Sequence, residues 1–241
     1  EELLVGVLVA YCSRRAGASG TFFDAYVQGM HMLAACPLWA GLDQAGALSV
    51  FEFALERLCG GYYQDTSFGS FKQDVFVTEA LIEERLPHLS VALRSACVPT
   101  MSIAFDPLLC LFTYHMPSFA SLRFWDVLLL EGDAAIFAVL LVLLEELLPE
   151  AVGPPSAQDE SIVKWDGFPF VDRLHERSAE LTAEQVEVML GRVRVLLEGS
   201  DSEDGGGLRR RLHELRRYGV HDGDIGGEDG CVGAWWGHLR G

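Results

Sequence analysis

Apolar residues recur at helical spacing along most of this chain, and this periodicity limits its fold more than any other feature does. Between residues 75 and 93 they follow one another at steps of seven, four, three and four, which places them on one helix face. These residues are Val75, Ile82, Leu86, Leu89 and Leu93. No alternation of apolar and polar residues predicts a strand, and the sequence has no internal repeat. The sequence therefore predicts an all-α fold of several helices.

Start and stop signals predict where further helices lie. Residues 43–58 are apolar enough to be largely buried and end before a pair of glycines. Ser118 is the expected N-cap of a helix that ends at Gly132. Asp133 can then cap the next helix, which runs to about Pro149. Two helices joined so closely should pack as an antiparallel hairpin or a sharp corner.

A capping box predicts one more helix nearer the C-terminus. Thr182 and Gln185 have the spacing at which each side chain can bond the backbone of the other, and the apolar periodicity after them continues to about Glu198. We expect this helix to dock on the main body, because its apolar face would otherwise be exposed.

Shifts in composition divide the chain into four parts. Residues 1–150 carry the helical periodicity and form one helical domain, and residues 151–180 are expected to form a linker or loop. Residues 181–198 are the docking helix of the same domain. Residues 199–241 are low in complexity, glycine-rich and largely acidic, and we expect a flexible, disordered tail. Its stretch LRRRLHELRRY is short, basic and amphipathic and could contact a membrane or a partner, but we expect a solvated helix or disorder.

The charge balance excludes two classes of partner. The chain has 18 Lys and Arg against 35 Asp and Glu, a formal net charge of −17. This argues against nucleic-acid binding and against electrostatic docking on anionic lipid. The longest uncharged apolar run, Ala134 to Leu144, is far shorter than the ~20 residues of a membrane-spanning helix. Because the six cysteines are scattered and form no C-x-x-C pair, we expect free thiols and a cytoplasmic protein, at most peripheral on endomembranes.

The motifs of several enzyme classes are absent from the sequence. It has no phosphate-binding or dinucleotide-binding glycine pattern, no H-E-x-x-H and no G-x-S-x-G. The adjacent acids Glu83 and Glu84, like Glu145 and Glu146, point in different directions on a helix and do not form a catalytic pair. We therefore expect neither a metal nor a cofactor, and no reaction on a small substrate of the chain's own.

The segment AYVQGMHMLAA, residues 25–35, carries the strongest functional signal. By local chemistry alone, Gln28 would be a hydrogen-bonding residue at a helix terminus and Gly29 a site of close packing. The segment resembles, however, the Y-x-Q-G-M signature of the TBC-domain family, the GTPase-activating proteins of Rab-type small GTPases. A second run, DPLLCLFTYHMPSFASLRFWDVLLLEG, is similar to another motif of that family in the expected order. Its matching residues are Arg123, Trp125, Asp126, Glu131 and Gly132, whereas the tryptophan that opens the family's motif is absent.

The resemblance covers about residues 1–148 and implies an all-helical TBC-like domain whose partner is a Rab-type GTPase. It implies that Gln28 is a catalytic glutamine finger that enters the partner's nucleotide site, where GTP and Mg²⁺ belong to the partner. Tyr26, Gly29 and Met30 would bind the partner and shape the helix start around Gln28. We expect structural roles for Arg123, Trp125, Asp126 and Gly132, with Arg123 and Asp126 on one helix face.

The family's arginine finger, from an I-x-x-D-x-x-R motif, does not occur before AYVQGM. Arg14 and Arg15 lie in the segment CSRRAGASG, which we expect to be a loop, at the wrong place for that finger. One interpretation is a domain that is incomplete at its N-terminus, which the missing initial methionine favours. Another is a catalytically silent module that binds a GTPase or an adaptor. A third is an unrelated helical scaffold with chance similarity to the motifs.

Overall fold

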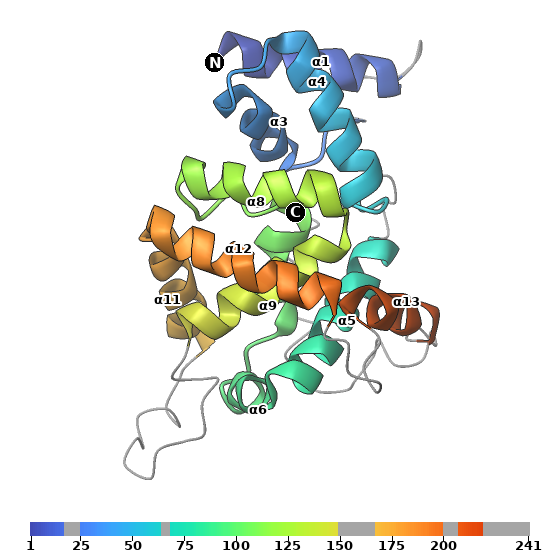
Figure 1. Cartoon of the computed structure of the whole chain (residues 1–241). Helices are drawn as coiled ribbons and strands as arrows, with labels where there is room; N and C mark the ends of the chain where they lie inside the picture. The colour runs from blue at the N-terminus through green and yellow to red at the C-terminus, as the bar shows by residue number, and fades with distance from the viewer. Residues whose placement is uncertain (17–24, 64–67, 149–166, 200–206, 219–241) are drawn as a thin grey trace.

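A computed structural model describes residues 1–16, 25–63, 68–148, 167–199 and 207–218 of the chain (Figure 1). Their regular elements are all helical, with no strand among them, so the predicted all-α fold is confirmed. The elements are α1 (Glu2–Ala16), α3 (Met30–Trp39), α4 (Gln44–Phe53), η1 (Ala54–Leu58), α5 (Gly69–Arg85), α6 (Pro87–Ser95), α7 (Thr100–Phe105), η2 (Asp106–Cys110), α8 (Ser118–Glu131), α9 (Ala134–Leu147), α11 (Gly167–Ala179), α12 (Ala183–Glu198) and α13 (Leu208–Tyr218). The elements η1 and η2 are single π-helical turns that continue α4 and α7.

Helix α9 lies at the centre of the larger part of the molecule. Twelve of its 14 residues are buried, and the two exceptions are glutamates in its last turn. A helix that is apolar on every side is stable only where other elements cover it. Helices α5, α8, α11, α12 and α13 all contact α9, and α12 makes the most extensive contact. Figure 1 shows α12 running alongside α9, with α8 above them.

Helices α1, α3 and α4 form a smaller layer at the top of Figure 1. They pack against one another, and the rings of Tyr11 on α1 and Phe51 on α4 meet edge to face with centroids 5.1 Å apart. Helix α3 also contacts α8 and η2 and therefore joins this layer to the rest of the molecule. The turn that begins α3 lies at this junction.

Two of the predicted helix boundaries are wrong. The expected continuous helix through residues 75–93 is divided into α5 and α6 at Leu86. The cause is Pro87, which lacks an N–H group and disfavours helical backbone at the residue before it. Ser118 is the first residue of α8 rather than its N-cap, because Pro117 occupies the N-cap position with φ −57° and ψ 142°. Asp133 does precede α9, but its side chain makes no capping bond.

Two segments expected to be irregular contain helices. The predicted linker, residues 151–180, includes α11, whose Phe170 and Leu174 lie four residues apart and are buried. The predicted disordered tail, residues 199–241, includes α13, whose Leu208 and Leu212 are likewise buried. In both helices a short row of apolar side chains is buried against the rest of the protein. Periodicity alone did not predict this packing. The other residues of both segments, except Glu180, Gly199 and Gly207, lie outside the described part of the chain.

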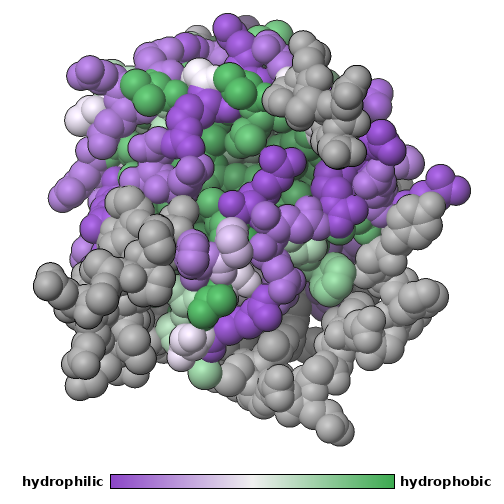
Figure 2. Space-filling view, turned by 60° about the horizontal axis from the view of Figure 1, so that its bottom comes forward, coloured by the Kyte–Doolittle hydropathy of each residue, from purple (hydrophilic) through white to green (hydrophobic). Residues whose placement is uncertain are grey.

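The described surface is mixed in character. Figure 2, which brings the lower end of Figure 1 forward, shows hydrophilic side chains around smaller hydrophobic areas. Within the described residues, no helix has both the length and the apolar character that crossing a membrane requires.

Candidate functional site

Gln28 lies in a tight turn immediately before α3, and its side chain is exposed. The turn is closed by two backbone hydrogen bonds: Met30 N–H donates to the carbonyl of Val27 at 3.2 Å, and Met32 N–H to that of Gly29 at 2.9 Å. These bonds fix the backbone on both sides of Gln28. The side-chain amide, which both donates and accepts hydrogen bonds, is therefore presented to solvent from an ordered turn.

Gly29 is required in this turn for two independent reasons. It is the N-cap of α3 and adopts φ 104°, a left-handed conformation that residues with a Cβ rarely adopt. It is also buried, and a Cβ there would lie 3.3 Å from the hydroxyl oxygen of Tyr63 and 3.6 Å from the sulfur of Cys110. A side chain at position 29 would thus strain the backbone and crowd the hydroxyl of Tyr63.

The side chains of Tyr26 and Met30 stabilise the turn through hydrogen bonds to residues on either side of Gln28. The hydroxyl of Tyr26 and Nδ1 of His31 share a hydrogen bond of 3.0 Å, which spans the turn from one side to the other. Burial raises the pKa of Tyr26, so its hydroxyl keeps its proton near neutral pH. Met30 is fully buried, and its sulfur accepts a 3.4 Å bond from the N–H of Val27. Tyr26, Gly29 and Met30 therefore shape the turn, whereas their direct contact with a partner stays a prediction.

Tyr63 is the part of this site that sequence reasoning missed. Its hydroxyl donates a 2.5 Å hydrogen bond to the carbonyl of Leu109, the residue before Cys110. Burial raises the pKa of Tyr63 well above its ordinary value, with smaller contributions from neighbouring groups that include Asp106. Only the fold brings residues 29, 63 and 110 together. In the sequence, Tyr63 is only the second of two tyrosines after a pair of glycines, and this pattern does not predict which residues it contacts.

The residues of the second motif lie on α8 or, in the case of Gly132, directly after it. The buried indole of Trp125 donates a 2.9 Å hydrogen bond to the carbonyl of Leu111, which has φ 48°. Arg123 pairs with Asp126, three residues along the same face, and with Glu187 on α12. Gly132 ends α8 with φ 79°. The structural roles expected for all four residues stay predictions.

Arg14 and Arg15 do not lie in a loop, as the sequence suggested, but in the last turn of α1. Helix α1 extends further because its apolar side packs against α3 and α4 and stabilises the turn that carries the arginines. Arg14 Nη1 lies 2.9 Å from Glu52 Oε1 on α4. Both arginines are exposed.

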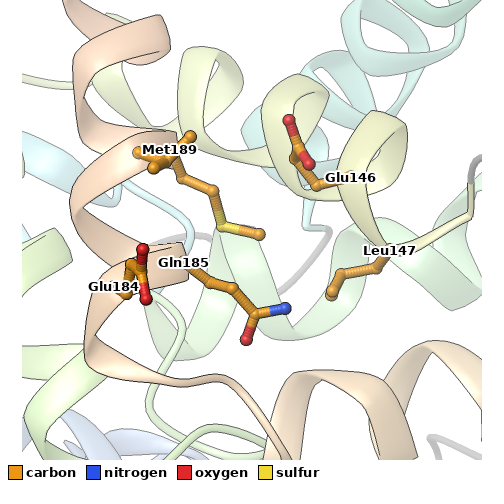
Figure 3. Close-up of a pocket in the computed structure, with 6 residues that line it drawn as sticks. Glu146, Leu147, Glu184, Gln185 and Met189 are labelled. Carbon is orange, nitrogen blue, oxygen red and sulfur yellow. The ribbon is translucent and has the colours of Figure 1, made fainter.

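A shallow pocket of about 230 Å³ lies between α9 and α12 (Figure 3). Its lining residues are Glu146, Leu147, Glu184, Gln185, Val188 and Met189. None of the predicted site residues contributes to this pocket. Gln28 itself lies exposed on the protein surface.

Comparison with known proteins agrees with the motifs. The family model of the Rab-GTPase-TBC domain matches residues 1–151. TBC1 domain family member 2A of Rattus norvegicus is 29% identical over 118 residues, which make up 49% of this chain and 13% of that protein. Growth hormone-regulated TBC protein 6 of Caenorhabditis elegans is 26% identical over 118 residues, 49% of this chain and 35% of that protein. The chain therefore matches only a minor part of the length of these relatives.

A solved structure supports the same fold. The crystal structure of the Chlamydomonas flagellar RabGAP TBC domain superposes with a TM-score of 0.59 and 23% sequence identity, over 80% of this chain and 58% of that one. The family model alone spans more than half of the chain and includes both motifs and the Gln28 turn. The resemblance stated from the two motifs is confirmed, and the chain belongs to the Rab-GTPase-TBC domain family.

Proposed function

We propose that the chain is part of a GTPase-activating protein for Rab-type small GTPases and that Gln28 acts as its glutamine finger. The observation that carries this proposal is the position of Gln28: exposed, on a turn fixed by Gly29 and the Tyr26–His31 bond, within the family's domain. A finger that enters another protein's nucleotide site must protrude and must also be held in one conformation. The exposure of Gln28 and the hydrogen bonds of its turn support the proposal on both counts.

The chemistry suits a side-chain amide. GTP hydrolysis needs a water molecule that is aligned with the γ-phosphate, and an amide can accept a hydrogen bond from that water while it donates one to a phosphate oxygen. Fixing the water in this geometry lowers the activation barrier by positioning. The proposed activator is not an enzyme on a substrate of its own, because the GTP and Mg²⁺ are those of the partner. Such a protein would act in vesicle trafficking, in the cytoplasm or peripherally on endomembranes.

A catalytically silent binding module is the second candidate. It would apply if a version extended upstream also lacked an I-x-x-D-x-x-R motif, since an arginine finger contributes about 10³–10⁵ to the rate. Arg14 does not take the place of that finger in this arrangement, because its guanidinium pairs with Glu52. In this alternative the Gln28 turn would serve recognition alone.

Single-turnover GTP hydrolysis by a panel of Rab-type GTPases tests the proposal, with this chain and with a version extended upstream. We expect acceleration by the extended version and a loss of about 10²-fold when Gln28→Ala is introduced. The matched control is Gln44→Ala, which removes another exposed glutamine, in the first turn of α4, and should leave acceleration unchanged. Binding without acceleration in either version would favour the silent module, and full activity of Gln28→Ala would refute the finger.

A further inference from the structure

Helix α13 is fastened to the body of the molecule by three arginines. Arg209 binds Glu131 at the end of α8, through both its carboxylate and its backbone carbonyl. Arg211 binds Glu84 on α5. Arg216 is the most buried of the three, and it reaches between α5 and the start of α9. The basic helix α13 thus packs on acidic side chains of α5 and of the α8–α9 corner. It lies outside residues 1–151, which the family model matches.

Arg216 is the centre of this contact. Its Nε and Nη2 donate to the two oxygens of Asp74 at 2.8 and 2.9 Å, and its Nη1 donates to Asp133 at 2.5 Å. The guanidinium carbon also lies 5.4 Å from the centre of the Phe137 ring. Gln73 adds a 2.7 Å bond to the backbone carbonyl of Arg216. A planar guanidinium that binds one carboxylate at two points fixes both its own position and that of the carboxylate.

Asp74 transmits this contact to the interior. Its side chain is only 7% exposed, and its Oδ2 accepts a 2.5 Å hydrogen bond from the hydroxyl of Tyr62. Burial, and then the charge of Asp74, raises the pKa of Tyr62 well above its ordinary value, so that hydroxyl remains a donor. Without Arg216, Asp74 would be a buried carboxylate with an insufficient set of partners. It would have to find new partners by moving, and that move would disturb its bond with Tyr62.

Tyr62 is the neighbour in sequence of Tyr63, which lies beneath the Gln28 turn. The ring of Tyr62 is 1% exposed and packs edge to face on Phe71, with centroids 5.7 Å apart. The hydroxyl of Tyr63 is bonded to Leu109 and occupies the space next to Gly29. A shift of Tyr62 therefore moves the backbone that places Tyr63 against the turn.

We propose that α13 is a positioning element for Gln28, which acts through the contacts Arg216–Asp74–Tyr62 and the adjoining Tyr63. When α13 is docked, Tyr63 is held under Gly29 and the turn keeps the conformation that presents Gln28. When α13 is released, the turn loses this support. Docking of α13 is then a point of control, and a ligand that competes for α13 or for Asp74 would weaken activation without touching Gln28.

Amide hydrogen exchange tests this coupling without any GTPase. The reporters are the amides of Met30 and Met32, whose hydrogen bonds close the turn. We expect Arg216→Gln to speed their exchange by about three- to thirtyfold, the range that couplings of this kind span. The control is Arg210→Gln, because the side chain of Arg210 is 75% exposed and pairs with Glu214 of its own helix. It should leave both amides unchanged.

Tyr62→Phe provides a second test that preserves the core. It keeps the ring and removes only the hydroxyl bonded to Asp74, so we expect the same faster exchange of Met30 and Met32 while α13 remains helical. Circular dichroism verifies that each variant is folded. If either variant is folded and both amides exchange at the original rate, the coupling does not exist. If Arg216→Gln does not fold, Tyr62→Phe alone decides.

The activity measurement rests on the proposed function and is read separately. In the version that accelerates GTP hydrolysis, Arg216→Gln should lower the rate at saturating activator by about tenfold and change GTPase affinity by less than about threefold. A fall in affinity with an unchanged saturating rate would show that α13 serves binding rather than positioning. If the original protein accelerates no GTPase, the proposed function fails, and the exchange rates still decide whether α13 is coupled to the turn.

Discussion

The indole nitrogen of Trp125 lies 2.9 Å from the carbonyl oxygen of Leu111 and donates a hydrogen bond to it in the interior of the protein. Leu111 and Phe112 have φ values of 48° and 64°, an uncommon conformation for residues with bulky side chains. The bond supplies a partner to a buried carbonyl where the backbone leaves the regular helix of α7 and η2. Trp125 therefore stabilises the segment that carries Leu109 and Cys110 to the Gln28 turn.

Trp125→Phe should lower the free energy of unfolding by about 1–3 kcal/mol, because it leaves a buried carbonyl without its donor. Trp39→Phe is the matched control, since Trp39 is 42% exposed at the end of α3 and should change stability by less than about 0.5 kcal/mol. Urea unfolding followed by circular dichroism measures both. Equal effects of the two substitutions would contradict the role of the bond.

Gly29→Ala should destabilise the protein more than Gly41→Ala. Both glycines have positive φ, 104° and 84°, so both variants carry the backbone strain of about 1–2 kcal/mol. Only at Gly29 would the new Cβ crowd another group, the hydroxyl of Tyr63, because nothing lies within 4 Å at Gly41. The difference between the two free energies of unfolding isolates the crowding. If Gly41→Ala is the more destabilising, Tyr63 does not confine the turn.

Local signals in the sequence predicted the parts of the fold that depend on neighbours in the chain. The capping box of Thr182 and Gln185 is present, with both of its reciprocal bonds. Gly132 ends α8 as expected. Each feature depends on residues at most four positions apart, so a short segment contains all that determines it.

The supports of the candidate site could not be predicted in this way. Tyr63 reaches Leu109 across 46 positions, and Arg216 reaches Asp74 across 142. Helix α13 has leucines at helical spacing, Leu208, Leu212 and Leu215, but in a stretch of 11 residues this periodicity does not reveal whether the helix docks. Its burial depends on acidic side chains of α5 and of the α8–α9 corner, which lie far away in the sequence. The family motif identified Gln28 as the proposed finger residue, whereas only the tertiary structure identified the residues that support its turn.

Stability should fall in acid through a pair of histidines that joins α11 to the segment before α8. The rings of His115 and His175 stack with centroids 3.4 Å apart and planes 8° apart. Burial, and then the charge of His175, lowers the pKa of His115 to about 4, and burial also lowers that of His175 although Asp172 opposes it. The unfolded chain, with an ordinary histidine pKa of about 6.5, binds more protons than the folded chain below that pH. The pair's contribution is therefore intact above about pH 6.5 and decreases toward pH 4.

His115→Phe removes one titrating ring and keeps an aromatic one in the stack, so the loss of stability between pH 6.5 and pH 4 should become smaller. Burial raises the pKa of Asp106 to about 7, which has the opposite sign, because the folded chain then binds the extra proton. For this reason the informative quantity is the difference between variant and original protein at each pH, from urea unfolding. His88→Phe, at an exposed position on α6, is the control. An unchanged pH profile for His115→Phe would contradict the assignment.

Gln28→Glu separates the amide's chemistry from its shape. Glutamate has the same length and fits the same exposed turn, so the free energy of unfolding should change by less than about 0.5 kcal/mol. It lacks the N–H donors, however, and its carboxylate would face the negative charge of the γ-phosphate. In the version that accelerates GTP hydrolysis, the single-turnover rate should therefore fall by about 10²–10³-fold. Gln28→Asn retains the amide but is shorter by one methylene, and it should lose part of the acceleration through misplacement alone. A glutamate variant that still accelerates hydrolysis would mean that the Gln28 turn contributes only contact area, as in the silent module.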